Sequence, residues 1–410
     1  MQIGFVNFNT EERKRVAKMM QLLQESEAIE ELGIGRVRDH FSNTLFPGTS
    51  TLQHHAKYFV VLPALYYYTA FKNRKFQNIA EVSRFIKEAE IQITRQMAEW
   101  DNGKIKTKQT GITGINTLND ALHDYTKYVK YDPAYIYGSG LTRYGIIPDT
   151  GVERLILELN KKYFEDPHNN RTLKREDSTD DAGDLTGEKQ LIKTCGENYD
   201  FFNGKTMELS LTEKEASFLK DRIHATCDGT LLDYLINSRF DIPENIGYFD
   251  MERILSDLSF AVVDIYKKSV LFSKLMHLVD WRFNYCYYNS FGKYDDAEFC
   301  ENKYIELLRE YEMDIKNQKA YNALFDYIRN IDTMLSDFCE NCYKAIINVE
   351  LTRIDQLVKA REYTVKRDRS KIGNPVYKDQ RRGNPFPNTF RWETVRTIAN
   401  EIRNPHKKYD

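Results

Sequence analysis

The chain has 410 residues, more than a single hydrophobic core usually supports, so we expect two or three domains. Hydrophobic residues make up 41% and charged residues 29%, a composition that excludes a chain disordered throughout. The net charge of −2 gives no overall reason to expect nucleic acid, and the six irregularly spaced cysteines fit a reducing cytoplasm better than a disulfide framework.

No segment of the sequence predicts secretion or membrane insertion. The first residues lack the basic stretch and apolar run of a secretory signal. The most apolar window, residues 58–71, is shorter than the roughly 20 residues of a membrane-spanning helix and contains Pro63. We therefore expect a cytoplasmic protein without membrane contact. The 27 tyrosines suit half-buried helix faces, either at the rims of helical cores or at partner surfaces.

The first part of the chain predicts a series of short helices. One is expected after Thr10, whose hydroxyl can cap it, and Pro63 is expected to kink or end the helix that starts at Leu52. Helical spacing of apolar residues predicts further helices at residues 37–45, 78–100 and 118–128. The Gly- and Tyr-rich stretch at residues 132–147 would fit a small winged-helix-like unit.

Composition then divides the chain. Residues 165–203 are rich in Asp, Glu, Asn, Thr and Gly, which indicates a surface loop or linker. Thr212 and Glu215 have capping-box spacing, and long helices are expected at residues 251–289, 297–316 and 320–369. We predict a mainly α fold, with an N-terminal helical domain that allows the winged unit and a C-terminal helical bundle. The predicted segments are an N-terminal domain at 1–163, an acidic loop or linker at 164–205, a helical bundle at 206–372 and a basic aromatic segment at 373–410.

Motifs for known catalytic or cofactor chemistry are missing from the sequence. It contains no phosphate-binding loop of the Walker type, no nucleophile elbow and no His-Glu-x-x-His helix. Four cysteines raise the question of a zinc site: Cys286, Cys300, Cys339 and Cys342. The last two lie within a predicted helix and the first two are not paired, so small buried thiols explain the pattern as well. We expect no cofactor and no metal.

The last part of the chain is basic. Residues 353–410 contain fifteen Lys or Arg and seven Asp or Glu, a local balance near +8 that would suit a phosphate backbone or an acidic partner. Basic and aromatic residues alternate there, as in surfaces that bind nucleic acid or a partner protein. The candidate binding residues are Arg381, Arg382, Phe390, Arg391, Trp392 and Arg396. The alternative is a docked segment in which Phe390, Trp392 and Ile398 point inward and the arginines outward.

A turn at residues 46–51 is a second candidate site. A helix that starts there would present free backbone amides to an anion such as phosphate. The candidate residues are Gly48, Thr49, Ser50 and Thr51. Gln53, His54 and Lys57 follow closely, so this is the first place to look for an enzymatic site. The alternative is that the turn only caps the helix.

Three blocks near the N-terminus, at residues 31–39, 45–53 and 56–59, resemble the opening signature of an uncharacterised bacterial family, known only as a domain of unknown function. The likeness continues through residues 111–115, 135–147, 211–223 and 390–392. The resemblance implies an accessory component of prokaryotic anti-phage defence islands, encoded near helicase and phospholipase-D-like genes. It assigns no functional residue, and this chain differs from the usual pattern in its Tyr-rich stretches and acidic linker.

Two hypotheses about function follow. The first is a non-enzymatic accessory subunit of an anti-phage defence complex that contacts DNA, a helicase or nuclease partner, or both. The second is an enzyme or toxin-like effector that acts on nucleic acid through a site built from dispersed polar residues.

Overall fold

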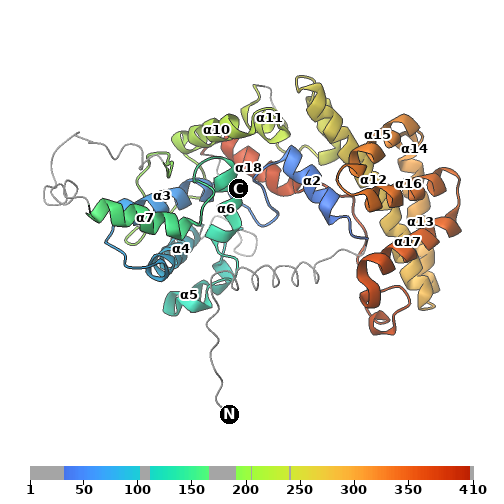
Figure 1. Cartoon of the computed structure of the whole chain (residues 1–410), viewed down its shortest axis with the longest axis horizontal. Coiled ribbons are helices and arrows are strands. Elements are labelled where there is room, and N and C mark those ends of the chain that lie inside the picture. Colours follow the sequence, from blue (N-terminus) through green and yellow to red (C-terminus); the bar gives the residue numbers. More distant parts are fainter. Residues whose placement is uncertain (1–31, 102–110, 166–190, 205, 240–241, 407–410) are drawn as a thin grey trace, which may run out of the picture. The chain divides into compact units, whose positions relative to one another are not determined.

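A computed structural model describes residues 32–101, 111–165, 191–204, 206–239 and 242–406 (Figure 1). This part of the chain is mainly α-helical, as predicted, and it contains no β-strand. The helix expected after Thr10 and most of the predicted acidic linker lie outside the described residues. Within them, no helix has the length and apolar character needed to cross a membrane.

The chain packs into two compact units. Unit 1 comprises Met1–Phe41 and Asp264–Phe390, and unit 2 comprises Ser42–Val263 and Arg391–Asp410. The chain therefore passes between the units three times, whereas composition predicted four consecutive segments. Composition detects polar stretches, but a compact unit is defined by contacts between residues that are distant in sequence. The predicted basic C-terminal segment is divided between the two units at position 390.

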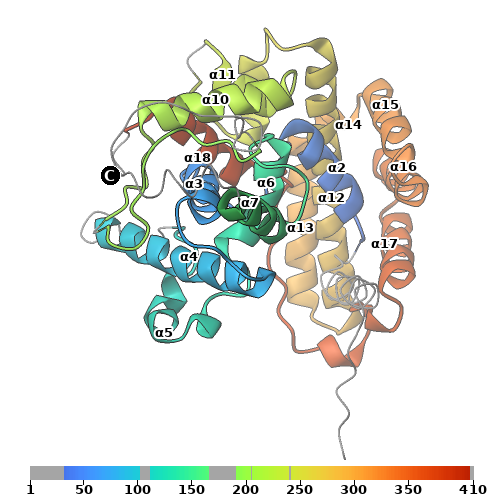
Figure 2. The same ribbon diagram turned by 60° about the vertical axis from the view of Figure 1, so that its left-hand side comes forward.

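Unit 2 is built around one buried helix, α3 (Tyr58–Phe71). Its sequence is apolar on all sides, which is typical of a helix enclosed by others. The helices that pack on α3 are α4 (Ile79–Asp101), α6 (Pro133–Arg143), α7 (Val152–Glu165) and α10 (Glu213–Cys227) (Figures 1 and 2). The remaining longer helices of the unit are α11 (Leu231–Asn237) and α18 (Trp392–Arg403), and both pack on α10.

The start of α3 differs from the prediction. The helix begins at Tyr58 instead of Leu52, and Pro63 lies inside it without ending it. Residues 58–66 are all buried, so packing on every side maintains the helix where proline removes one backbone hydrogen bond. Residues 46–57 form turns that lead into the helix.

The winged unit expected near residues 132–147 is not formed. Residues 111–147 contain no strand, and α6 ends instead in a turn at Gly145, whose φ is +59°. The amides of Ile146 and Ile147 both donate to the carbonyl of Leu141, at 2.9 and 3.3 Å. Both isoleucine side chains are buried, so the apolar pair closes a helix instead of forming a strand.

A buried carboxylate caps α6. Glu90 of α4 is 1% exposed, and its Oε1 accepts the amide of Ala134 at 2.8 Å. Burial, with a further contribution from the charge of Asp132, raises the pKa of Glu90 well above its usual range. The folded protein therefore retains a proton that the unfolded chain releases as pH rises. The contribution of Glu90 to the free energy of unfolding is therefore fully present below the ordinary pKa of a glutamate, and it is lost as pH rises toward the higher pKa of the folded state.

We expect Glu90→Gln to raise the thermal unfolding midpoint at pH 8 by a few degrees, on the order of 2–4 °C. Glutamine keeps an oxygen for the amide of Ala134 and carries no charge, so the gain should shrink toward pH 4.5. Thermal unfolding across this range measures the effect. Glu88→Gln on the exposed side of α4 is the matched control. A gain that does not change with pH would contradict the prediction.

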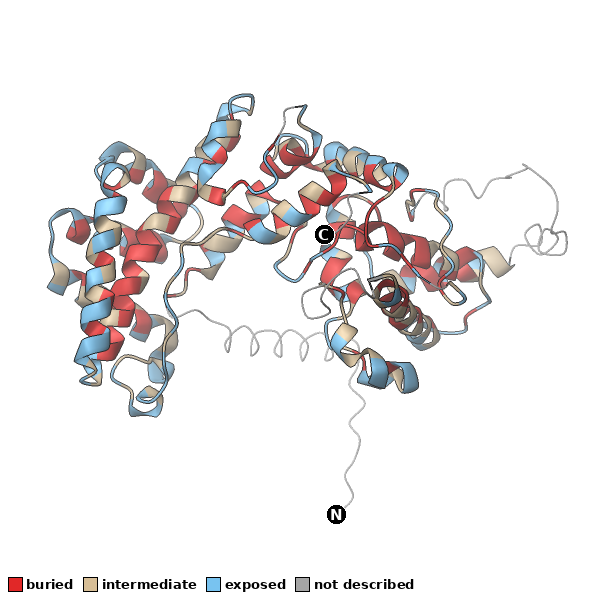
Figure 3. Cartoon of the chain, turned by 180° about the vertical axis from the view of Figure 1, so that it is seen from behind, coloured by how far each residue is buried: buried red, intermediate tan, exposed pale blue. Residues whose placement is uncertain are grey.

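Unit 1 is a set of helices packed side by side. Besides most of α12 (Phe260–Ser290), it contains α13 (Tyr294–Glu310), α14 (Glu312–Ile315), α15 (Gln318–Arg329), α16 (Thr333–Ile347) and α17 (Leu351–Lys366) (Figure 2). Buried and exposed residues alternate along these helices, as expected of amphipathic helices around a shared core (Figure 3).

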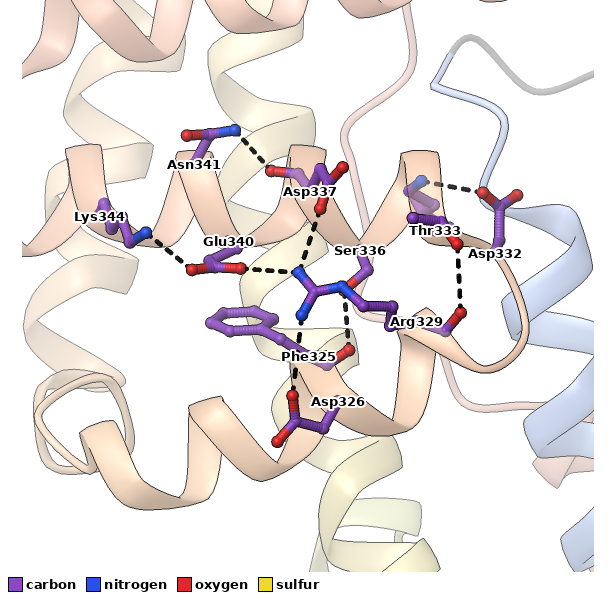
Figure 4. A network of polar contacts seen from close by, with 11 residues as sticks. Phe325, Asp326, Arg329, Asp332, Thr333, Ser336, Asp337, Glu340, Asn341 and Lys344 are labelled. Atoms are coloured by element: carbon purple, nitrogen blue, oxygen red, sulfur yellow. Dashed lines mark hydrogen bonds and ion pairs between the residues drawn. The ribbon is translucent and has the colours of Figure 1, made fainter.

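The single helix predicted at residues 320–369 is three helices, α15, α16 and α17. Asp332 lies between α15 and α16. Its side chain accepts the amide of Leu335 at 2.9 Å and caps the start of α16. Val349 has a φ of +58°, which interrupts the chain before α17. Arg329 joins α15 to α16 through Asp337 and Glu340, at 3.1 and 3.0 Å (Figure 4).

Candidate nucleic-acid interface

The strongest local charge among the described residues lies in unit 1, at the end of α17 and in the loop after it. We call residues 359–389 the basic segment. It contains nine Lys or Arg and three Asp or Glu, a balance of +6. The exposed cationic side chains include those of Lys359, Arg367, Lys378 and Arg381. Two aromatic rings are also exposed, Tyr363 at 57% and Phe386 at 81%.

Side chains of α12 hold the loop of the basic segment in place. The hydroxyl of Tyr287 donates to the carbonyls of Tyr377 and Gln380, the latter at 2.8 Å. The hydroxyl of Tyr288 accepts the amide of Arg382 at 3.0 Å and lies 3.2 Å from its carbonyl. Because these bonds engage the loop backbone, the loop needs no regular secondary structure to stay ordered.

A buried carboxylate fixes the turn after α17. Glu362 is 1% exposed, and its oxygens accept the amides of Lys371 and Ile372 at 2.6 and 3.1 Å. One of the three acids of the basic segment is therefore turned inward, where it binds the segment's own backbone. Arg367 adopts a φ of +52° at the point where the chain reverses.

Arg382 is an anchor of the loop. Its guanidinium carbon lies 4.6 Å from the centroid of Phe283 and 5.6 Å from that of Tyr287. Its Nε donates to Asn284 Oδ1 at 2.6 Å, and Asn284 Nδ2 donates to the carbonyl of Gly383 at 3.0 Å. Among the predicted binding residues, Arg382 is thus half-buried and ordered, whereas Arg381 is exposed.

The two predicted stacking residues of the C-terminal region are buried. Phe390 is 1% exposed and packs in unit 1 against Phe41. Trp392 is 2% exposed in unit 2, where its Nε1 donates to the carbonyl of Ile246 at 3.0 Å. Stacking on a base needs an accessible ring face, so this burial argues against the predicted role for both rings. It agrees with the alternative, in which they dock the segment.

Two of the remaining predicted arginines have local structural contacts in unit 2. Arg391 donates from one guanidinium nitrogen to Asn43 Oδ1 at 2.8 Å and to the carbonyl of Thr49 at 2.7 Å. Arg396 pairs with Glu393 at 2.5 Å. The six residues predicted as one binding surface are therefore distributed over two units.

In the predicted anion-binding turn, polar groups form hydrogen bonds within the protein. Thr49 is buried, and its hydroxyl donates to the carbonyl of Phe46 at 2.7 Å. Gln53 is fully buried; its Oε1 accepts the amide of Ser50 at 3.1 Å, and its Nε2 donates to the carbonyl of Gly48 at 3.2 Å. These contacts hold the turn together, with Gly48 and Ser50 half-buried and Thr51 exposed.

The backbone amides before α3 also have partners. The amides of His54 and His55 donate to the hydroxyl of Tyr137 at 3.0 and 3.1 Å. The amide of Ala56 donates to Glu401 Oε2 at 2.6 Å, and His55 Nδ1 lies 2.8 Å from the other oxygen of that carboxylate. A carboxylate from α18 therefore binds the backbone just before α3, several residues after the predicted anion-binding turn at residues 48–51.

A buried ion pair lies beside this helix start. Lys57 Nζ is 2.7 Å from Glu215 Oε1, and the two side chains are 5% and 1% exposed. The hydroxyl of Tyr199 donates to the same carboxylate, and burial followed by the charge of Glu215 raises the pKa of Tyr199. The neutral phenol of Tyr199 and the paired ammonium of Lys57 connect distant segments through Glu215 and offer no reactive group. The enzymatic hypothesis thus gains no support from this cluster.

The four cysteines considered for zinc are buried thiols in unit 1. Burial raises the pKa of Cys286 and Cys339 to about 12 and that of Cys300 to about 11. Zinc binds the thiolate form, which these surroundings disfavour. Within the described residues, they do not form a group of three ligand atoms within reach of one ion.

Comparisons with known proteins are consistent with the resemblance seen in the sequence. Residues 1–146 match the model of a family of unknown function (DUF6361). The matched region is about a third of the chain and ends before the basic segment. No curated protein and no solved structure matches the chain. A likeness to an uncharacterised family is therefore confirmed over residues 1–146, while the blocks at residues 211–223 and 390–392 lie outside the match, and the family assigns no activity.

Sequence reasoning found the charge of the basic segment but missed its anchors. Tyr287 and Tyr288 appeared only as members of a Tyr-rich helix, and their loop partners lie 90 to 94 positions later. No local signal connects residues at that distance. The resulting surface presents cations and two exposed rings from an ordered backbone, which suits recognition of a phosphate chain with unpaired bases.

Proposed function

We propose that the chain is a non-enzymatic accessory subunit of a prokaryotic anti-phage defence complex and contacts single-stranded DNA through the basic segment. The observation that supports contact with DNA is the set of exposed cations on a loop anchored to α12. An ordered cationic loop can bind phosphates without first losing much conformational freedom. The helicase or nuclease partner of such a complex would carry the chemistry.

Single strands fit this surface better than duplex. Tyr363 and Phe386 are exposed aromatic residues within the same basic segment, and the ring of Tyr363 lies 5.8 Å from the guanidinium of Arg367. Aromatic rings stack on unpaired bases of any sequence, whereas bases in a duplex are already stacked on one another. The defence context rests on the resemblance of the N-terminal blocks alone.

The triple variant Arg367→Ala, Lys378→Ala, Arg381→Ala tests the proposal. We expect it to weaken binding of a single-stranded oligonucleotide on the order of tenfold at moderate salt, because three phosphate contacts are removed. The slope of log affinity against log salt concentration should fall in magnitude by about 2, at roughly 0.7 per phosphate. Fluorescence anisotropy at several salt concentrations gives both quantities.

A matched control removes the same charge elsewhere in unit 1. Arg309, Lys316 and Lys319 are exposed cations outside the basic segment. Their replacement by Ala should leave the salt slope nearly unchanged. Equal losses in both triple variants would mean that binding reflects net charge, and wild-type binding that is absent or independent of salt would overturn the proposal.

A further inference from the structure

A cavity of about 310 Å³ lies beneath the loop of the basic segment, within unit 1. One wall is α12, which contributes Ser273, His277, Asp280 and Asn284. The opposite wall is the loop at residues 382–386, whose backbone is tied to α12. The loop wall includes Arg382, the sequence neighbour of Arg381, which we assign to a phosphate contact.

A buried hydroxyl in this wall points to a polar ligand. Ser273 is 0% exposed, and its Oγ has no hydrogen-bond partner within the described part of the protein. Buried hydroxyl groups nearly always have a partner, because losing water without replacement is unfavourable. Ser273 lines the cavity, so a ligand there can supply the missing hydrogen bond.

The other groups of the cavity are polar and aromatic side chains. His277 lies 3.0 Å from the hydroxyl of Tyr311 and 3.1 Å from the indole nitrogen of Trp281. Burial lowers the pKa of His277, which favours the neutral form of its ring. Phe283 contributes an apolar ring to the wall, and Phe386 projects at the rim with 81% of its surface exposed. The carboxylate of Asp280 is an acceptor for an amino group.

We infer that this cavity takes one nucleobase with an exocyclic amino group, extruded from a DNA strand bound along the basic segment. The volume is at the lower end of the range for small-molecule sites, enough for one base or nucleoside. The exocyclic amino group of the base would donate to the carboxylate of Asp280, the hydroxyl of Ser273 would form a hydrogen bond with the base, and the ring would stack on Phe386. This inference rests on the proposed function, because the strand delivers the base.

The test separates the base from the phosphates. The full-length protein is titrated with a strand of about 12 abasic spacers and with the same strand carrying one central adenine. We expect the single adenine to raise affinity about tenfold, and a central thymine, which lacks an exocyclic amino group, to raise it less. The gain from adenine should fall below about twofold in Ser273→Val and in Phe386→Ala, and Ser273→Val should leave binding of the abasic strand unchanged.

Two controls keep the result interpretable. Ser273 is buried and Phe386 is 81% exposed, so the thermal midpoint of both variants is measured, and we expect that of Phe386→Ala to be unchanged. Tyr294→Ala on α13 removes a ring that is 70% exposed outside the cavity and should keep the full gain from adenine.

The outcomes distinguish the two proposals. If the abasic strand binds with a salt-dependent affinity but adenine adds nothing, the cavity assignment is overturned and contact with DNA stands. If neither strand binds, the proposed function fails first. Free adenosine monophosphate is the third arm: if it binds as tightly as the strand with adenine, the cavity serves a free nucleotide and the strand version is overturned.

Discussion

Replacing Asp355 by Ala should destabilise unit 1 by about 3–5 kcal/mol, because it leaves a buried guanidinium without its main partner. Arg282 of α12 has only 1% of its side chain exposed. Its nitrogens reach the carboxylate of Asp355 in α17 through three hydrogen bonds of 2.7 to 2.9 Å. A further bond of 3.2 Å leads to Glu301 in α13, so one side chain joins three helices.

Hydrogen–deuterium exchange of α12, α13 and α17 in the full chain measures this loss locally, and urea unfolding measures it globally. The double variant Arg282→Met, Asp355→Leu should be much less harmful, because no buried charge remains. Arg329→Ala is the matched surface control. It breaks ion pairs between an arginine and several carboxylates (Figure 4), but Arg329 is 41% exposed, so water can solvate the carboxylates that remain. Equal effects in Asp355→Ala and Arg329→Ala would refute the argument.

Trp392→Ala should destabilise unit 2 by about 3–5 kcal/mol, the usual result of removing a large buried aromatic side chain. The indole packs with Phe46 at 6.0 Å and Tyr248 at 6.3 Å between ring centroids. Its nitrogen donates to the carbonyl of Ile246, which would lose a partner. Trp392→Phe keeps most of the volume, so its loss should be smaller.

This variant also distinguishes a structural tryptophan from one that binds nucleic acid. We expect Trp392→Phe to lower the unfolding midpoint and to leave oligonucleotide affinity unchanged where the protein is folded. A fall in oligonucleotide affinity without a change in stability would instead indicate that Trp392 contacts nucleic acid. Denaturant unfolding and anisotropy on the same preparations provide the comparison.

Short-range signals determined much of the secondary structure. The expected helix at residues 78–100 is α4 at Ile79–Asp101. The capping box of Thr212 and Glu215 forms with both of its hydrogen bonds. Such features depend on residues three or four positions apart, which is the range of a helical turn. The local pattern failed to predict the helix ends within residues 320–369. This stretch lacks Pro and Gly, yet it is divided into three helices at Asp332 and Val349.

Only the tertiary structure decided the roles of the polar and aromatic residues. Glu215 is a local cap by sequence, but its carboxylate also neutralises Lys57, 158 positions away. Trp392 follows a basic run, and its burial depends on Ile246 and on rings from distant segments. The sequence by itself determined a mainly helical chain with a basic stretch near its end. Which cations of that stretch face solvent depended on long-range hydrogen bonds to α12, and these leave no periodic signal in the sequence.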